Sequence, residues 1–255
     1  MGPLMLTSVA TLVFCAPGYP GGAEEAQPFV EQFATSAAAV AGWPAGSLTA
    51  VYDPTEQGGV AKLARPDAAL AFVPYVFFFQ HGAELHLTPL VQADVTGIGT
   101  AERWTLVAKV GTNGAASLAG YTLLSVAGYA PDFVRHAALE GWPLPPDVRI
   151  QSTGQLLGAL RRIAAGEPVV TLLDQTQAAA LPTLPFAAQL KALMRSPPLP
   201  VAIVAVVNGR LSGTRVRSMQ AGLLKMEHAG DADALAQLHL HGFVLPQLPG
   251  HAVGP

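Results

Sequence analysis

The feature that most constrains the fold is a regular alternation of short apolar segments and helical segments near the start of the chain. The apolar segments are rich in β-branched residues, and each is followed by a stretch with helical spacing. The first expected strands are Leu6–Cys15, Ser47–Tyr52 and Ala68–Val73. Strands that alternate with helices usually form a sheet covered by those helices, so the pattern predicts an α/β fold.

The alternation continues, less regularly, through the rest of the chain. Further strands are expected at residues 87–94, 103–110, 122–126, 148–151, 169–173 and 201–207. The clearest helix is Gln155–Ala165, which is amphipathic and ends at Gly166. Other helices are expected at residues 24–40, 55–63, 76–81, 131–137, 176–180, 215–228 and 233–239.

The composition favours a folded protein and argues against several functions. Hydrophobic residues make up 51% of the 255 residues and charged residues only 12%, which is too apolar for a disordered chain. The net charge of −3, without a lysine or arginine cluster, argues against nucleic-acid binding. Cys15 is the only cysteine, and no histidines form an H-x-x-x-H pair. We therefore expect no metal, no cofactor and no nucleic-acid partner.

The N-terminal segment permits two interpretations. Residues 4–16 are apolar and could be taken for a signal peptide that ends at a lipidated Cys15. However, no lysine or arginine precedes this run, and Phe14 is too bulky for a signal-peptidase site. We interpret the segment as a buried first strand. We expect a periplasmic protein whose export signal is not part of this chain, and no membrane span.

Several segments, taken in order, resemble one family of binding proteins. They are Asp67–Pro74, Glu102–Ala108, Ser117–Gly120, Ala159–Gly166, Val170–Asp174 and Arg195–Pro200. In order and spacing they resemble the phosphate, phosphite and phosphonate family of ABC-transporter substrate-binding proteins, which have the type 2 periplasmic-binding fold. The chain would be a divergent member of that family.

The resemblance implies two α/β lobes joined by a two-strand hinge. Lobe one would contain residues 1–98 and 200–255, and lobe two would be the inserted residues 99–199. A small ligand would bind in the cleft between the lobes, for delivery to a membrane transporter component. We expect the protein to be a monomer.

The candidate ligand-binding residues follow from the positions of the strand ends. In open α/β sheets, ligands bind outside the carboxyl ends of the strands. Here these ends carry most of the tyrosines, whose apolar ring and polar hydroxyl suit an amphipathic ligand. Asp174 could accept a hydrogen bond from a ligand, or it could simply cap the next helix. The expected ligand-binding residues are Tyr19, Tyr52, Tyr75, Phe78, Tyr129, Phe133, Asp174 and Gln175.

The strand-end segments contain little that would bind an anion. The serine and threonine residues that the family uses for oxyanions are missing from residues 128–132, where Pro131 lacks an amide proton. The acidic candidates Asp53, Asp132 and Asp174 would repel a phosphonate but could accept a hydrogen bond from a hydroxyl group. We therefore expect a mainly apolar or amphipathic ligand, such as a sterol or another lipid.

Three alternatives remain open from the sequence. Backbone amides can bind oxyanions without any side-chain signal, so phosphonate, phosphate or another small anion is a second candidate ligand. An enzyme on the same fold is less favoured, because no nucleophile–base pair lies at the expected strand ends. We therefore predict a binding protein without enzymatic activity. A sensor domain would need an output module, which no segment here supplies.

Overall fold

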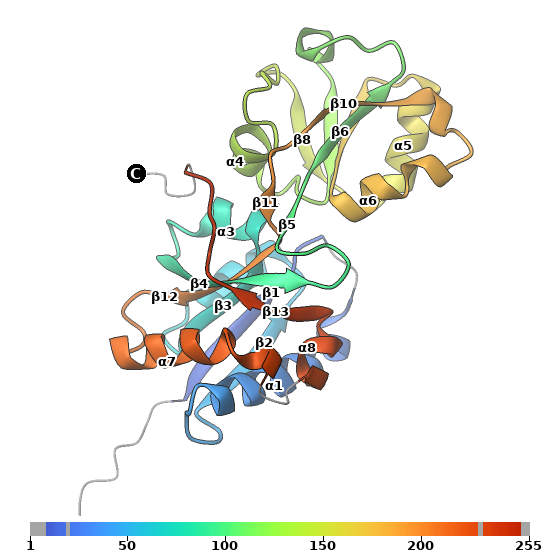
Figure 1. Ribbon diagram of the computed structural model, residues 1–255. Coiled ribbons are helices and arrows are strands. Elements are labelled where there is room, and N and C mark those ends of the chain that lie inside the picture. Colours follow the sequence, from blue (N-terminus) through green and yellow to red (C-terminus); the bar gives the residue numbers. More distant parts are fainter. Residues whose placement is uncertain (1–8, 19–20, 229–231, 251–255) are drawn as a thin grey trace, which may run out of the picture. The chain divides into compact units, whose positions relative to one another are not determined.

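The structure, a computed structural model, describes residues 9–18, 21–228 and 232–250 (Figure 1). The described part of the chain forms two compact units. Within the described ranges, the first contains residues 9–16, 21–100, 200–228 and 232–247, and the second contains residues 17–18, 101–199 and 248–250. Most of the second unit is therefore an insertion, which the chain enters after Thr100 and leaves at Pro200.

The first unit is built on a six-stranded mixed sheet in the order β13-β4-β12-β3-β1-β2. Its strands are β1 (Ala10–Cys15), β2 (Leu48–Asp53), β3 (Ala68–Pro74), β4 (Leu87–Val95), β12 (Ala202–Val207) and β13 (Leu240–Val244). Strand β1 is parallel to both β2 and β3, so the carboxyl ends of these three strands meet at one edge. The pairs of β12 with β3, β12 with β4 and β13 with β4 are antiparallel.

A cluster of phenylalanine rings forms the centre of the first unit's core. The helices described in this unit are α1 (Ala23–Val40), α2 (Glu56–Leu63), α3 (Tyr75–His81), α7 (Gly213–Leu223) and α8 (Ala232–Gln237), with a 3-10 turn at Met226–His228. Phe14 of β1, Phe33 of α1 and Phe72 of β3 contact one another, with ring centroids 5.0–5.7 Å apart. Phe243 of β13 completes the cluster, at 6.0 Å from Phe33 and 5.9 Å from Phe72.

Two features near the C-terminus differ from the sequence-based expectation. The sequence pattern does not predict β13, because its five residues include His241 and Gly242. Its pairing with β4 and the contacts of Phe243 stabilise this strand, and both are long-range interactions. The helix expected at residues 215–228 is shorter than predicted, since α7 ends at Leu223 and a separate 3-10 turn follows.

The second unit is built on a five-stranded sheet in the order β10-β6-β9-β7-β8. Its strands are β6 (Thr105–Lys109), β7 (Thr122–Ser125), β8 (Arg149–Ser152), β9 (Val169–Leu173) and β10 (Leu190–Arg195). Strand β7 is parallel to β8 and β9, whereas β6 is antiparallel to β9 and β10. The carboxyl ends of β7, β8 and β9 therefore meet at one edge of this sheet.

The helices of the second unit are mostly short. They are α4 (Pro131–Phe133), α5 (Leu156–Ala165) and α6 (Gln175–Ala179), with 3-10 turns at Ala115–Leu118, Leu181–Thr183 and Ala187–Gln189. The helix expected at residues 131–137 is α-helical for one turn only and continues as a π-helix, Val134–Ala138. Arg135 on this π-helix donates hydrogen bonds to three carbonyl oxygens of the following loop, which fixes that loop.

Ser196 fastens the two ends of the insertion to each other. The connecting strands β5 (Ala101–Glu102) and β11 (Leu199–Pro200) form a two-stranded sheet. Next to them, the Trp104 N–H donates to Ser196 Oγ at 2.9 Å, and the Ser196 N–H donates to the Trp104 carbonyl at 2.8 Å. Arg103 adds a hydrogen bond to the Ser196 carbonyl at 2.7 Å. Because Ser196 is fully buried, water cannot replace these bonds.

We expect Ser196→Ala to destabilise the protein by about 1–3 kcal/mol, because it leaves the buried Trp104 N–H without an acceptor. Urea-induced unfolding of the variant and the wild type measures this loss. Ser152→Ala, which removes an exposed hydroxyl from β8 of the same unit, is the matched control and should leave stability unchanged. Equal stability of the wild type and Ser196→Ala would show that the bond does not fasten the insertion.

Candidate functional site

Asp53, at the carboxyl end of β2, is held by residues of the protein itself. Its carboxylate accepts hydrogen bonds from the Thr55 N–H at 2.9 Å and the Thr55 hydroxyl at 2.7 Å, and it forms an ion pair with Lys62. Burial acts to raise the pKa of Asp53, but the bonds from Lys62 and Thr55 outweigh it and lower the pKa below its ordinary value. This carboxylate therefore fastens α2 to the end of β2.

Cys15, at the carboxyl end of β1, is a buried and unreactive thiol. Its sulfur donates a hydrogen bond to the Thr55 carbonyl at 3.3 Å. Burial, followed by the negative charge of Asp53, raises its pKa to about 12. Since the thiolate is the reactive form of cysteine, this residue is not a nucleophile at neutral pH.

The aromatic candidates of the first unit lie at the ends of β2 and β3. Tyr52 is half-buried, whereas Tyr75 and Phe78, at the start of α3, are 1% and 5% exposed. The rings of Tyr75 and Phe78 stack with centroids 6.3 Å apart, so the structure brings these two predicted residues together. Tyr19 lies outside the described residues.

The aromatic candidates of the second unit follow β7. Gly128 passes so close to β8 that a Cβ atom there would be 2.1 Å from the Gln151 carbonyl oxygen, so this position needs glycine. The next residue, Tyr129, is half-buried and lies in the turn before α4. Phe133 is fully buried, with its ring edge against Trp104 at a centroid distance of 5.4 Å. Phe133 is thus part of the core of the second unit.

Asp174 follows β9 and caps helix α6. Its carboxylate accepts a hydrogen bond from the Gln177 N–H at 2.8 Å, and the Gln177 side chain accepts one from the Asp174 N–H at 3.0 Å. This is a capping box, the structural role that the sequence left open for Asp174. The predicted residue Gln175 is the first residue of the same helix and is half-buried.

Glu102 is the residue of this region that the sequence-based list of site residues omits. It lies on the connecting strand β5, is 5% exposed, and accepts a hydrogen bond from the Gln175 N–H at 3.4 Å. Burial, followed by the negative charge of Asp174, raises the pKa of Glu102 to about 7. Burial also raises the pKa of Asp174. Two buried carboxyl groups therefore meet at the start of α6, and near neutral pH one of them can hold a proton.

This carboxyl pair gives the carboxyl edge of the second sheet an acidic character. Within the described chain, neither Glu102 nor Asp174 forms an ion pair with a lysine, arginine or histidine. The pair repels anions and favours a group that donates a hydrogen bond. The sequence did offer a signal for Glu102, because it is a glutamate just before an apolar strand. Its proximity to Asp174 could not be predicted, since that depends on the order of the strands in the sheet.

The described residues contain no cluster of three or more histidine, cysteine, aspartate or glutamate side chains that could hold a metal ion. In the same part of the chain, every helix is too short or too polar to cross a membrane.

No protein-family model and no curated protein matches this chain. Several solved structures are similar to it. One is XAC2383 from Xanthomonas citri bound to chloride ion, with 16% identity, a TM-score of 0.66, and coverage of 94% of this chain and 93% of the other. The same protein bound to ATP is similar to the same degree, with a TM-score of 0.66.

Two phosphonate-binding proteins are also similar in structure. PhnD1 from Prochlorococcus marinus, in complex with methylphosphonate, has 10% identity and a TM-score of 0.56, with 93% of each chain covered. A binding protein component of an ABC phosphonate transporter from Pseudomonas aeruginosa has 15% identity and a TM-score of 0.53, covering 92% of this chain and 81% of the other. The chain therefore has the type 2 periplasmic-binding-protein fold, which confirms the fold that the sequence predicts.

We expect the protein to lose stability as the pH rises from 4.5, the ordinary pKa of a glutamate, to about 7, the pKa of Glu102. The folded state keeps the Glu102 proton in this range while the unfolded state releases it, so the free energy of unfolding falls by at most about 3 kcal/mol. Urea unfolding at several pH values measures this decline. The Glu102→Gln variant should show a smaller decline and should be more stable than the wild type above pH 7. The control variant Glu24→Gln, at an exposed position of α1, should show the same decline in stability as the wild type.

We expect Gly59→Ala to destabilise the first unit by about 1–3 kcal/mol through overpacking. A Cβ atom at Gly59 would lie 2.1 Å from the Cys15 sulfur, and the buried strand β1 cannot move away. Gly158→Ala is the matched control, because Gly158 is also inside a helix but faces open space. The control should be neutral or slightly stabilising. A similar unfolding temperature for both variants would contradict the close contact of α2 with β1.

Proposed function

We propose that this chain is the periplasmic solute-binding component of a bacterial ABC transporter, and that it binds a small amphipathic ligand. The fold supports the general role, because the similar structures include binding proteins of ABC transporters. The ligand class rests on the side chains at the carboxyl ends of the strands. The unreactive Cys15 thiol favours binding over catalysis.

The observation that carries the ligand class is the Glu102–Asp174 pair beside aromatic residues. A carboxyl pair that holds one proton offers one hydrogen-bond donor, and the carboxyl oxygens that do not accept from Gln175 and Gln177 offer acceptors. A hydroxyl or amine group suits that arrangement, and a phosphonate does not. The half-buried ring of Tyr129 follows the adjacent strand β7 and offers apolar surface. Burial of apolar ligand surface at roughly 25 cal/mol per Å² supplies affinity without an ion pair. Sterols and other lipids that carry a hydroxyl group have this chemistry.

A small anion is the second candidate ligand. The observation that favours it is the set of ligands in the similar structures, namely the chloride and ATP of XAC2383 and the methylphosphonate of PhnD1. Backbone amides would have to bind the anion, since the acidic pair opposes it.

Two measurements separate the candidates. Purified protein is incubated with a bacterial lipid extract, re-isolated, and analysed by mass spectrometry for retained lipids. The same protein is titrated calorimetrically with phosphate, methylphosphonate and 2-aminoethylphosphonate. We expect a retained lipid and no saturable heat with the anions. Tight methylphosphonate binding with no retained lipid would refute the amphipathic ligand.

We expect Tyr129→Ala to weaken binding of the retained lipid by about 1–3 kcal/mol, the usual effect of removing an aromatic anchor. Tyr129→Phe keeps the ring and should retain most of the affinity. Unfolding temperatures of both variants should match the wild type, because Tyr129 is only half-buried. Unchanged affinity of Tyr129→Ala would place the ligand elsewhere, and a large loss of stability would make Tyr129 a structural residue.

A further inference from the structure

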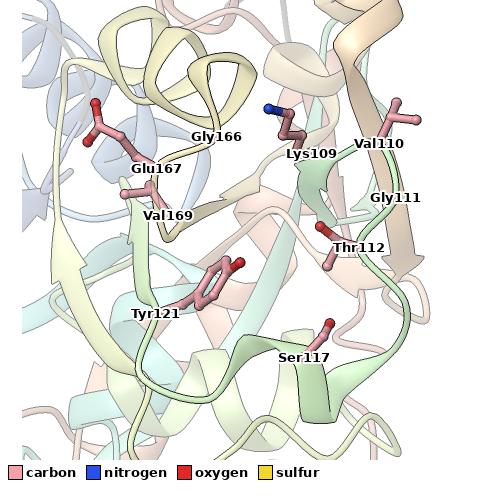
Figure 2. Close-up of a pocket in the computed structure, with 9 residues that line it drawn as sticks. All are labelled: Lys109, Val110, Gly111, Thr112, Ser117, Tyr121, Gly166, Glu167 and Val169. Carbon is pink, nitrogen blue, oxygen red and sulfur yellow. The ribbon is translucent and has the colours of Figure 1, made fainter.

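The second unit contains a cavity at the edge of its sheet opposite to the carboxyl ends of β7 and β9 (Figure 2). Its volume is about 350 Å³. Tyr121 precedes the first residue of β7 and Val169 is the first residue of β9, so the cavity lies at the amino ends of these strands. Strand β7 has four residues and spans about 13 Å, which separates the cavity from Tyr129 and Asp174.

Polar groups from separate chain segments converge on this cavity. Figure 2 shows the hydroxyl groups of Thr112, Ser117 and Tyr121 directed toward the space between them, whereas the Lys109 amine lies at the Gly166 side of the cavity. The acid among the lining residues, Glu167, points its carboxylate away from Tyr121 and Thr112. Arg162 Nε donates to that carboxylate at 2.7 Å, so its charge is compensated outside the cavity.

Most of these donors have no partner in the protein. Across the residues that the structure describes, the Lys109 amine and the hydroxyls of Thr112 and Tyr121 form no hydrogen bond or ion pair. The Ser117 hydroxyl donates to the Gly114 carbonyl at 2.8 Å, and its oxygen remains able to accept. The cavity therefore presents one cation and two hydroxyl donors to whatever enters it.

Gly166 leaves room for the lysine amine. It ends helix α5 with a φ of +92°, and a Cβ atom there would be 2.7 Å from Lys109 Nζ. The amine thus lies beside the carboxyl end of a ten-residue helix, where the helix dipole stabilises a positive charge. This contact holds Lys109 at the cavity while leaving its hydrogen atoms available.

We propose that this cavity is a second binding site, separate from the strand carboxyl ends, for a small organic anion with a carboxylate or phosphate group. Lys109 pairs with the anionic group beside Gly166, and the hydroxyls of Thr112 and Tyr121 bind polar groups on the rest of the molecule. The remaining volume accommodates the body of the molecule, against the apolar side chain of Val169. This site does not depend on the ligand of the proposed transport function.

Nuclear magnetic resonance with labelled protein tests the site directly. The probes are citrate and glycerol 3-phosphate, with glycerol as the uncharged control. We expect both anions to cause saturable shifts in the amides of residues 109–112, Gly166, Glu167 and Val169, and glycerol to cause none. Shifts spread over all surface lysines, or no saturation with either anion, would overturn the proposal.

Two substitutions identify the groups that bind. Lys109→Met should weaken citrate binding at least tenfold, and Tyr121→Phe should weaken it several-fold. Lys191→Met removes the same charge from an exposed position of the neighbouring strand β10 and should leave citrate affinity unchanged. Circular dichroism checks that each variant is folded. Equal affinity of Lys109→Met and Lys191→Met would assign citrate binding to general surface charge and refute the site.

Discussion

The buried hydrogen bonds between Trp104 and Ser196 hold together the two ends of an insertion of about a hundred residues. The start of β6 and the end of β10 lie side by side, with Thr105 opposite Arg195. The same bonds fix the position of Trp104, whose ring contacts Phe133 of α4, the helix that follows the turn containing Tyr129. They also fix β5, which brings Glu102 to the start of α6. The carboxyl edge of the second sheet therefore depends on one buried serine.

Much of the architecture could be predicted from local patterns. Strands β2 to β4 lie within one residue of their expected bounds, β9 matches them, and β1 ends at Cys15 as expected, because buried strands have a strong apolar signal. Residues 6–8 of the expected first strand lie outside the described residues. Strand β13 could not be predicted, since its stability comes from β4 and the phenylalanine cluster rather than from its own residues. Similarly, Pro131 signalled the start of a helix, but no local rule predicts a π-helix beyond it.

For the candidate site, the sequence predicted which residues lie at the strand ends better than it predicted which groups those residues contact. The ends of β2, β3, β7 and β9 carry the expected side chains, but sequence could not show which of them the fold already uses. Asp53 is occupied by Lys62 and Thr55, and Asp174 by Gln177. Glu102 and Asp174 are 72 residues apart, and only the paths of β5 and β9 bring them to the same helix end. The electrostatic character of this edge thus comes from topology more than from composition.

The burial of Cys15 has a practical consequence for experiments in solution. Its thiol is 1% exposed and stays protonated at neutral pH, so maleimide reagents should not react with it while the first unit is folded. A cysteine introduced on the surface could then carry a fluorescent dye without prior removal of the native one. Conversely, labelling of Cys15 would report transient separation of α2 from β1, which makes this residue a built-in probe of local opening.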